Sequence, residues 1–193
     1  MLEESIRQCK QWEHAGRLFT VSINLSTRNL SEPDLVDNVL HVLSDWKLDP
    51  SRIILEITES AVIADPVGTR RVLARLNKHG IKVAIDDFGA GSTSLSHLAH
   101  LPINELKIDR SFITGMTADT HDRAIVRSII NLSHDLGLDV VAEGVETREV
   151  LDELRELGCD LIQGYYFSRP LVADEVAAWF ENEAPDERTI RAA

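Results

Sequence analysis

The sequence predicts an α/β fold, a TIM-type (β/α) barrel that is incomplete and holds about six βα units. Apolar strands alternate strictly with amphipathic helices, and each strand is short and almost wholly apolar, as in parallel sheets covered by helices. Each strand also carries a polar residue near its end. A doubly wound sheet is the alternative, but it binds ligand at one switch point, whereas a barrel collects residues from many strand ends. No GxGxxG motif follows any strand, which also favours the barrel.

The elements follow from the hydrophobic periodicity. The chain begins with a helix over residues 1–15, in which Leu2, Ile6, Cys9 and Trp12 share one face. Apolar strands are expected over residues 18–26, 52–60, 83–85, 104–109, 139–146 and 159–164. Helices are expected over residues 31–46, 65–80, 120–136, 147–158 and 174–181. The polar residues near the strand ends are Asn24, Glu56, Asp86 with Asp87, Lys107, Glu143 and Gln163.

Helix starts are marked by capping residues. Ser31 is expected to cap the helix over residues 31–46, and Asp65 with Pro66 to start the next one. Thr147 is expected to cap the helix that follows the fifth strand.

The length accounts for about three quarters of a barrel. A complete eight-stranded barrel typically needs about 250 residues, and this chain has 193. Because a helix, which normally follows a strand, comes first, we expect the absent units to precede Met1. Residues 1–182 are predicted to form the barrel domain, and residues 183–193 a loose tail.

Charge and composition exclude several classes of function. The net charge of −12 leaves no basic stripe to grip a long nucleic acid, and a small phosphate ligand would need metals as a bridge. No apolar run reaches the roughly 18 residues of a membrane span, and no signal peptide is visible, so a cytoplasmic location is expected. Cys9 and Cys159 lack zinc-ligand spacing and are expected to be reduced and partly buried.

Two adjacent carboxylates carry the chemical signal. Asp86 and Asp87 end a buried strand in the stretch IKVAIDDFGAGSTSLSHL, where they repel each other unless a cation or a shared proton offsets the charge. A lone pair of aspartates is more often a helix cap. The other strand ends, however, add acids, carboxamides and Lys107, and oxygen ligands of this kind suit Mg²⁺ or Mn²⁺. Two-metal phosphoryl transfer and enolase-type proton abstraction both fit these residue types.

Six segments distinguish these two chemistries by resemblance. SINLS, LEITES, AIDDFGAGSTSL, ELKIDRSFI, VVAEGVET and QGYYFSRP, in this order, closely resemble the EAL family of cyclic di-GMP phosphodiesterases up to about Glu181. The resemblance implies a TIM-type barrel that hydrolyses one phosphodiester of cyclic di-GMP to linear pGpG with two Mg²⁺ or Mn²⁺ ions.

The resemblance also implies a role for each matching residue. The implied metal ligands are Asn24, Glu56, Asp86, Asp87 and Glu143. Lys107 resembles the residue that holds the catalytic water, Glu143 also counts as catalytic, and Gln163 resembles a group that positions water or substrate. Glu59 resembles the glutamate that anchors the loop after Asp87. In the family that loop is linked to dimerisation, so a homodimer through the loop and its neighbouring helices is expected.

Two departures from the family pattern qualify these implications. The loop reads DDFGAGSTSL where the family commonly has DDFGTGYSSL, so Ala90 and Ser92 replace a hydroxyl and an aromatic residue. The signature Glu-Ala-Leu is absent, and with it one metal ligand and the arginine that usually follows. We therefore expect weak or no turnover from this form of the chain. The alternative is a non-catalytic module that binds cyclic di-GMP or a protein partner.

Overall fold

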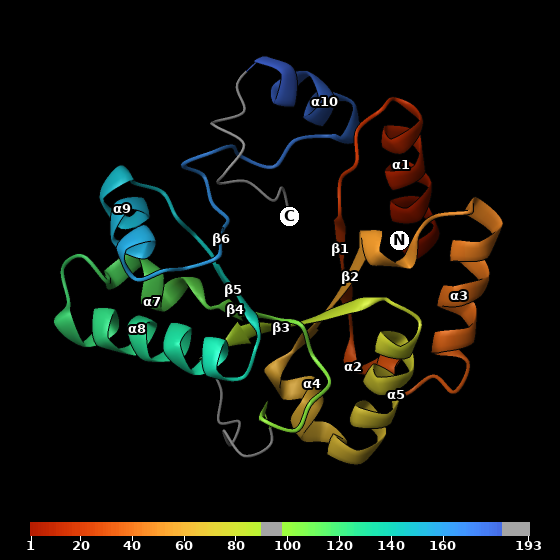
Figure 1. The fold of residues 1–193 in the computed structure, drawn as a ribbon, viewed down its shortest axis with the longest axis horizontal. Helices are drawn as coiled ribbons and strands as arrows, with labels where there is room; N and C mark the ends of the chain where they lie inside the picture. The colour runs from red at the N-terminus through yellow and green to blue at the C-terminus, as the bar shows by residue number, and fades with distance from the viewer. Residues whose placement is uncertain (90–97, 183–193) are drawn as a thin grey trace. The chain divides into compact units, whose positions relative to one another are not determined.

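The structure is a computed structural model that describes residues 1–89 and 98–182 (Figure 1). These residues form two compact units, Met1–Glu105 and the described residues from Leu106 onward. The loop positions Ala90 and Ser92 and the tail 183–193 lie outside the described residues. Among the helices of the described ranges, none is long and apolar enough to cross a membrane.

The first unit contains three parallel strands with helices between them. Its elements in chain order are α1 (Leu2–His14), β1 (Val21–Leu25), α2 (Thr27–Leu30), α3 (Leu35–Trp46), the 3-10 helix η1 (Pro50–Arg52), β2 (Ile53–Thr58), α4 (Glu59–Ala64), α5 (Pro66–Lys78) and β3 (Lys82–Phe88). β1 pairs with β2 from Val21↔Ile53, and β2 pairs with β3 from Ile54↔Lys82. Helices α3 and α5 lie side by side in Figure 1, and Arg75 on α5 binds Asp37 on α3 at 2.8 Å.

The second unit repeats the alternation. β4 (Glu105–Ile108) begins at the boundary of the two units and is followed by α7 (Arg110–Gly115), α8 (Thr120–Asp135), β5 (Asp139–Ala142), α9 (Arg148–Glu156), β6 (Leu161–Ile162) and α10 (Ala173–Asn182). The strand order is β4-β5-β6, and β5 and β6 are parallel. Parallel strands alternating with helices confirm the predicted α/β class.

Apolar side chains fill the space between strands and helices. In β2, Ile53, Leu55 and Ile57 have no exposed surface, and neither do Leu73 and Leu76 on α5. Successive residues of a strand face opposite sides, so burial of residues 53–57 means that both faces of the sheet are covered there. Each such side chain contributes about 1.5–3 kcal/mol relative to full exposure.

One predicted helix start is wrong. Helix α3 begins at Leu35, and Ser31 is instead the C-cap of α2, where its hydroxyl donates to the Thr27 carbonyl at 3.0 Å. The serine that caps a helix here is Ser26, which forms a capping box with Asn29. Helix α2 spans four residues, too few for helical periodicity to show in the sequence.

The other two predicted helix starts are confirmed. Asp65 starts α5 by accepting from the Gly68 amide at 2.9 Å. Thr147 caps α9 by accepting from the Val150 amide at 3.4 Å.

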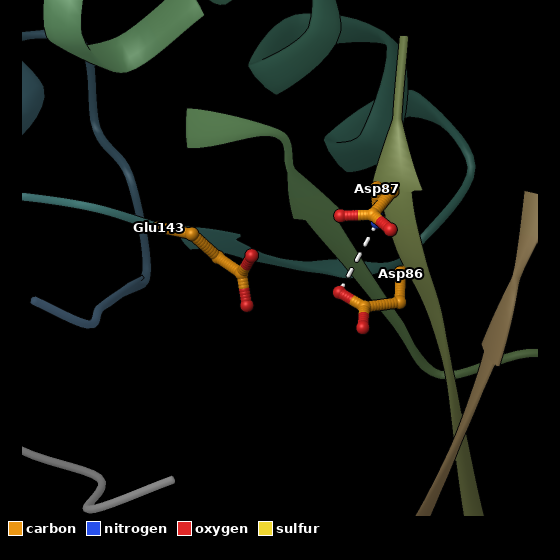
Figure 2. A group of neighbouring side chains, drawn as sticks. All are labelled: Asp86, Asp87 and Glu143. Atoms are coloured by element: carbon orange, nitrogen blue, oxygen red, sulfur yellow. Dashed lines mark hydrogen bonds between the residues drawn. The ribbon is translucent and has the colours of Figure 1, made fainter. Parts of the chain in front are cut away.

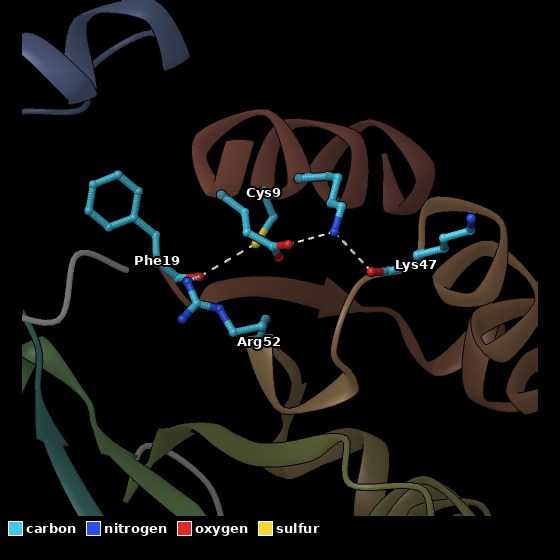
Figure 3. A network of polar contacts seen from close by, with 6 residues as sticks. Cys9, Phe19, Lys47 and Arg52 are labelled. Carbon is cyan, nitrogen blue, oxygen red and sulfur yellow. Dashed lines mark hydrogen bonds and ion pairs between the residues drawn. The ribbon is translucent and has the colours of Figure 1, made fainter. Parts of the chain in front are cut away.

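A network of polar contacts fixes α1 against the rest of the first unit (Figure 3). The Cys9 thiol donates to the Phe19 carbonyl at 3.4 Å, and the Arg52 guanidinium donates to the same oxygen. The Lys10 ammonium donates to the Lys47 carbonyl at 3.0 Å. These contacts join α1 to the segment before β1 and to the end of α3.

Two loop side chains extend the hydrogen-bond ladder of the strands. Before β4, Asn104 accepts from the Val83 amide through its side-chain oxygen at 2.9 Å, and its own amide donates to the Val83 carbonyl at 2.8 Å. Before β6, an Asp160 carboxylate oxygen accepts from the Val140 amide at 2.8 Å and also lies 2.9 Å from His134 Nε2. Each of these side chains thus binds an amide of the preceding strand.

Both cysteines are expected to resist alkylation in the folded protein. Burial raises the pKa of the Cys9 thiol, and burial raises the pKa of Cys159 to about 12. A raised pKa keeps the unreactive thiol form at pH 8, where an unfolded cysteine is already partly thiolate. Iodoacetamide at pH 8 should therefore label neither residue until urea is added, as followed by mass spectrometry. Rapid labelling without urea would contradict this.

Candidate active site

The first unit places three predicted ligands on one face of its sheet. Asn24 is the register partner of Glu56, and Thr58, two residues further along β2, is the partner of Asp86. Because alternate residues of a strand share a face, Asn24, Glu56 and Asp86 face the same side. Glu56 is only 5% exposed, whereas Asn24 is exposed.

Asp86 and Asp87 project to the same side of β3 because the backbone leaves the regular strand conformation (Figure 2). Adjacent residues of a strand normally point to opposite faces. Asp87, however, has a φ of 55°, in the left-handed region that aspartate tolerates better than most residues. The Asp87 amide also donates to Asp86 Oδ1 at 3.1 Å. The turn brings two like charges together, an arrangement that a cation would stabilise.

Glu59 is the first residue of α4 and does not belong to the preceding strand. Its carboxylate is 5% exposed and accepts from the Gly89 amide at 3.3 Å. Gly89 is the last described residue before position 98. This contact supports the predicted role of Glu59 as an anchor of the loop after Asp87, which stays a prediction.

The second unit brings Lys107 and Glu143 together. Lys107 lies in β4, and its Nζ is 2.6 Å from Glu143 Oε1, with the two side chains only 5% and 18% exposed. The prediction that Glu143 lies within a strand is wrong, since β5 ends at Ala142 and a glycine of left-handed φ, Gly144, follows. The Glu143 amide still donates to the Ile108 carbonyl at 3.4 Å. A largely desolvated ion pair therefore stands directly beyond the end of β5.

Gln163 follows β6 directly and is held through its backbone. Its amide donates to the Ala142 carbonyl at 2.8 Å, and its carbonyl accepts from the Val145 amide at 3.1 Å. Its side-chain Oε1 is buried and meets no hydrogen-bond donor among the described residues. A buried acceptor without a donor typically costs about 1–3 kcal/mol, so this oxygen is suited to bind a water or a ligand.

Two carboxylates of the first unit, Asp86 and Asp87, form a candidate pair of metal ligands, drawn in Figure 2. Carboxylate oxygens are the ligands that Mg²⁺ and Mn²⁺ prefer. Asp109, a residue without a predicted role, caps α7 by accepting from the Ser111 amide at 2.9 Å. Asp109 lies two residues after Lys107 in ELKIDR.

Comparison with known proteins identifies a family. The family model described as the EAL domain matches residues 1–170. The chain is 40% identical over 179 residues to the bifunctional diguanylate cyclase/cyclic di-GMP phosphodiesterase MucR of Pseudomonas aeruginosa. The matched region covers 92% of this chain and 26% of MucR. The chain thus spans about a quarter of the length of this curated relative.

Solved structures of other proteins are similar to the structure of this chain. The crystal structure of the EAL domain of Mycobacterium smegmatis DcpA matches with a TM-score of 0.90 at 35% identity, covering 96% of this chain and 84% of that one. The Klebsiella pneumoniae BlrP1 manganese/cyclic di-GMP complex matches with a TM-score of 0.80 at 36% identity. This match covers 87% of the present chain and 43% of the BlrP1 chain. This likeness confirms the predicted fold class, and the chain belongs to the EAL domain family.

Proposed function

We propose that this chain is a phosphodiesterase domain that hydrolyses cyclic di-GMP to linear pGpG with the help of two Mg²⁺ or Mn²⁺ ions. The observation that carries the proposal is the adjacent pair Asp86 and Asp87, whose side chains project to the same side of β3. Two similar proteins support it: MucR has been solved as a phosphodiesterase in complex with c-di-GMP, and BlrP1 with manganese and cyclic di-GMP.

The residues present fit divalent cations. Asn24, Glu56, Asp86, Asp87 and Glu143 would hold the ions, because all five offer the hard oxygen ligands that Mg²⁺ and Mn²⁺ prefer. When bound, such ions polarise a phosphodiester and lower the pKa of a coordinated water.

Lys107 and Gln163 would act on the attacking water. The Lys107 ammonium, fixed 2.6 Å from Glu143 and almost fully buried, can hold a water by hydrogen bonding and stabilise negative charge that develops on the phosphate. Its burial matters because charge interactions are stronger where bulk water is excluded. The Gln163 Oε1 can accept a hydrogen bond from the water or the substrate and thereby orient it.

Two further expectations remain proposals. A homodimer would form through the loop after Asp87 and its neighbouring helices, and residues 90–97 of that loop lie outside the described residues. The other is the cytoplasmic location expected from the sequence.

The second candidate function is a non-catalytic module that binds cyclic di-GMP or a protein partner. The observation that favours it is the absence of the Glu-Ala-Leu motif from the 193 residues, since this motif supplies one metal ligand in the family. For the same reason we propose that this form of the chain turns over slowly or not at all, and that a form extended upstream by that motif is faster.

Titration calorimetry with Mn²⁺ tests the metal site. Asp86→Asn should weaken Mn²⁺ binding at least about 10-fold, because it removes a charged ligand from a small set. Asp45→Asn is the matched control, since it makes the same change at an exposed position on α3 and should leave the affinity unchanged. Equal affinity in the wild type and Asp86→Asn would refute the assignment.

Product analysis then separates the two functions. The chain and its extended form are each incubated with cyclic di-GMP and Mn²⁺, and pGpG is followed by chromatography. Formation of pGpG that Asp86→Asn abolishes supports the phosphodiesterase. Binding of cyclic di-GMP without pGpG in either form would favour the binding module.

A further inference from the structure

Gly164 occupies a position where a side chain has no room. A Cβ added to it would lie 2.1 Å from the Val145 carbonyl oxygen and 2.3 Å from the Val145 nitrogen, whereas real Cβ atoms essentially never approach closer than 3.0 Å. Its φ is not in the left-handed region, so the backbone conformation itself does not demand glycine. Space against the Val145 peptide is therefore the reason that a glycine is needed here.

The close approach permits two hydrogen bonds between the same segments. The Val145 amide donates to the Gln163 carbonyl at 3.1 Å, and the Tyr166 amide donates to the Val145 carbonyl at 2.9 Å. Val145 is fully buried. A Cβ at position 164 would push the Val145 peptide away from residues 163–166 and lengthen both bonds.

The residue before Val145 is closely packed as well. This residue, Gly144, has a φ of 72°, and a Cβ there would lie 2.7 Å from Arg110 Cβ. Two residues before Val145 stands Glu143, whose Oε1 is 2.6 Å from Lys107 Nζ. A displacement of Val145 is thus transmitted along one short segment to the Glu143 carboxylate, and Gln163 is displaced from the other side.

We propose that Gly164 is a positioning residue that sets Glu143 and Gln163 in place by letting residues 163–166 lie against the Val145 peptide. The proposal rests on the proposed function, in which Glu143 is a metal ligand. Gly164 itself would touch neither metal nor substrate and would act through the backbone of its neighbours.

The test combines amide exchange with Mn²⁺ calorimetry on the 193-residue chain. In Gly164→Ala, the Val145 and Tyr166 amides should exchange faster, as seen by nuclear magnetic resonance, because their acceptors move away. Mn²⁺ affinity should fall about 10-fold, the effect typical of losing support for a ligand. In a Glu143→Gln background the same substitution should change the affinity less than about 2-fold, since the ligand it positions is already neutralised.

Gly158→Ala is the matched control. Gly158 lies before β6, whereas Gly164 lies after it; Gly158 has a φ of 79°, and no atom lies within 4 Å of its added Cβ. Its substitution should strain the backbone at that position alone and leave both amides and the Mn²⁺ affinity unchanged.

Several results would overturn the proposal. One is a Gly164→Ala variant whose amide exchange and Mn²⁺ affinity equal those of the wild type. Another is a loss of Mn²⁺ affinity that is as large in the Glu143→Gln background as in the wild-type background. The third is a Gly158→Ala variant with the same faster exchange and weaker Mn²⁺ binding. If Gly164→Ala does not fold, Gly144→Ala displaces the same segment from the Arg110 side and must show the Glu143-dependent loss, or the proposal fails. A wild type that binds no Mn²⁺ would refute the proposed function instead, and the exchange data would still test the packing of Gly164.

Discussion

Replacing Lys107 with methionine is expected to lower the conversion of cyclic di-GMP to pGpG by at least about 100-fold, the usual contribution of a group that handles a proton or a reacting water. Methionine keeps most of the side-chain volume in β4 but removes the ammonium that lies 2.6 Å from Glu143. The substitution therefore removes charge from the site and leaves a largely buried carboxylate without this partner. Turnover is measured by chromatography of pGpG at saturating substrate, in the form extended by Glu-Ala-Leu.

Lys78→Met is the control for the loss of a lysine, because Lys78 lies at the exposed end of α5. It should retain wild-type turnover. Wild-type turnover in Lys107→Met would show that this lysine does not take part in the reaction. A loss of turnover that merely parallels a loss of folded protein, judged by circular dichroism of the same sample, would assign Lys107 a structural role.

The second large effect is expected on stability, at the opposite end of the strands. Lys82 Nζ on β3 lies 3.4 Å from Glu105 Oε1 on β4, and the Glu105 side chain is only 4% exposed. Lys82→Met should reduce the free energy of unfolding by about 3 kcal/mol, the lower end for breaking a buried pair, because the lysine side chain keeps 31% of its exposure. Urea denaturation measures the change.

A double variant shows whether the charge on Glu105 causes this loss. Lys82→Met combined with Glu105→Leu replaces the pair by apolar side chains, and such replacements are often neutral or stabilising. The double variant should therefore be more stable than Lys82→Met alone. The explanation fails if Lys82→Met stays within about 0.5 kcal/mol of the wild type, the range of ordinary surface changes.

The elements that the sequence predicts well are those that local periodicity and capping determine. The alternation of strands and helices follows from runs of apolar residues long enough to show a period, as in β2 and α5. The start of α5 at Asp65 and Pro66 could be predicted because the aspartate carboxylate and the Gly68 amide it binds lie only three residues apart. Short helices such as α2, α4 and α7 escaped prediction, since four to six residues hold less than two turns.

The geometry of the candidate site could be predicted only in part. Polar residues near strand ends are visible in the sequence, and Asn24 and Glu56 do prove to be register partners. The left-handed backbone at Asp87 left no signal, because aspartate occurs in strands, turns and caps alike. The contact between Lys107 and Glu143 joins residues 36 positions apart in the numbering, so no local pattern could reveal it.

The hydrogen bonds of Asn104 and Asp160 affect how the length of this fold can vary. Each of these side chains binds an amide of the preceding strand. A slip of one residue in strand pairing would turn every side chain to the wrong face. Because a side chain directly before β4 or β6 re-establishes the alignment, insertions or deletions in the helices and loops upstream need not be transmitted into the strands. Such changes can accumulate between homologues while Lys107 and Gln163 keep their places.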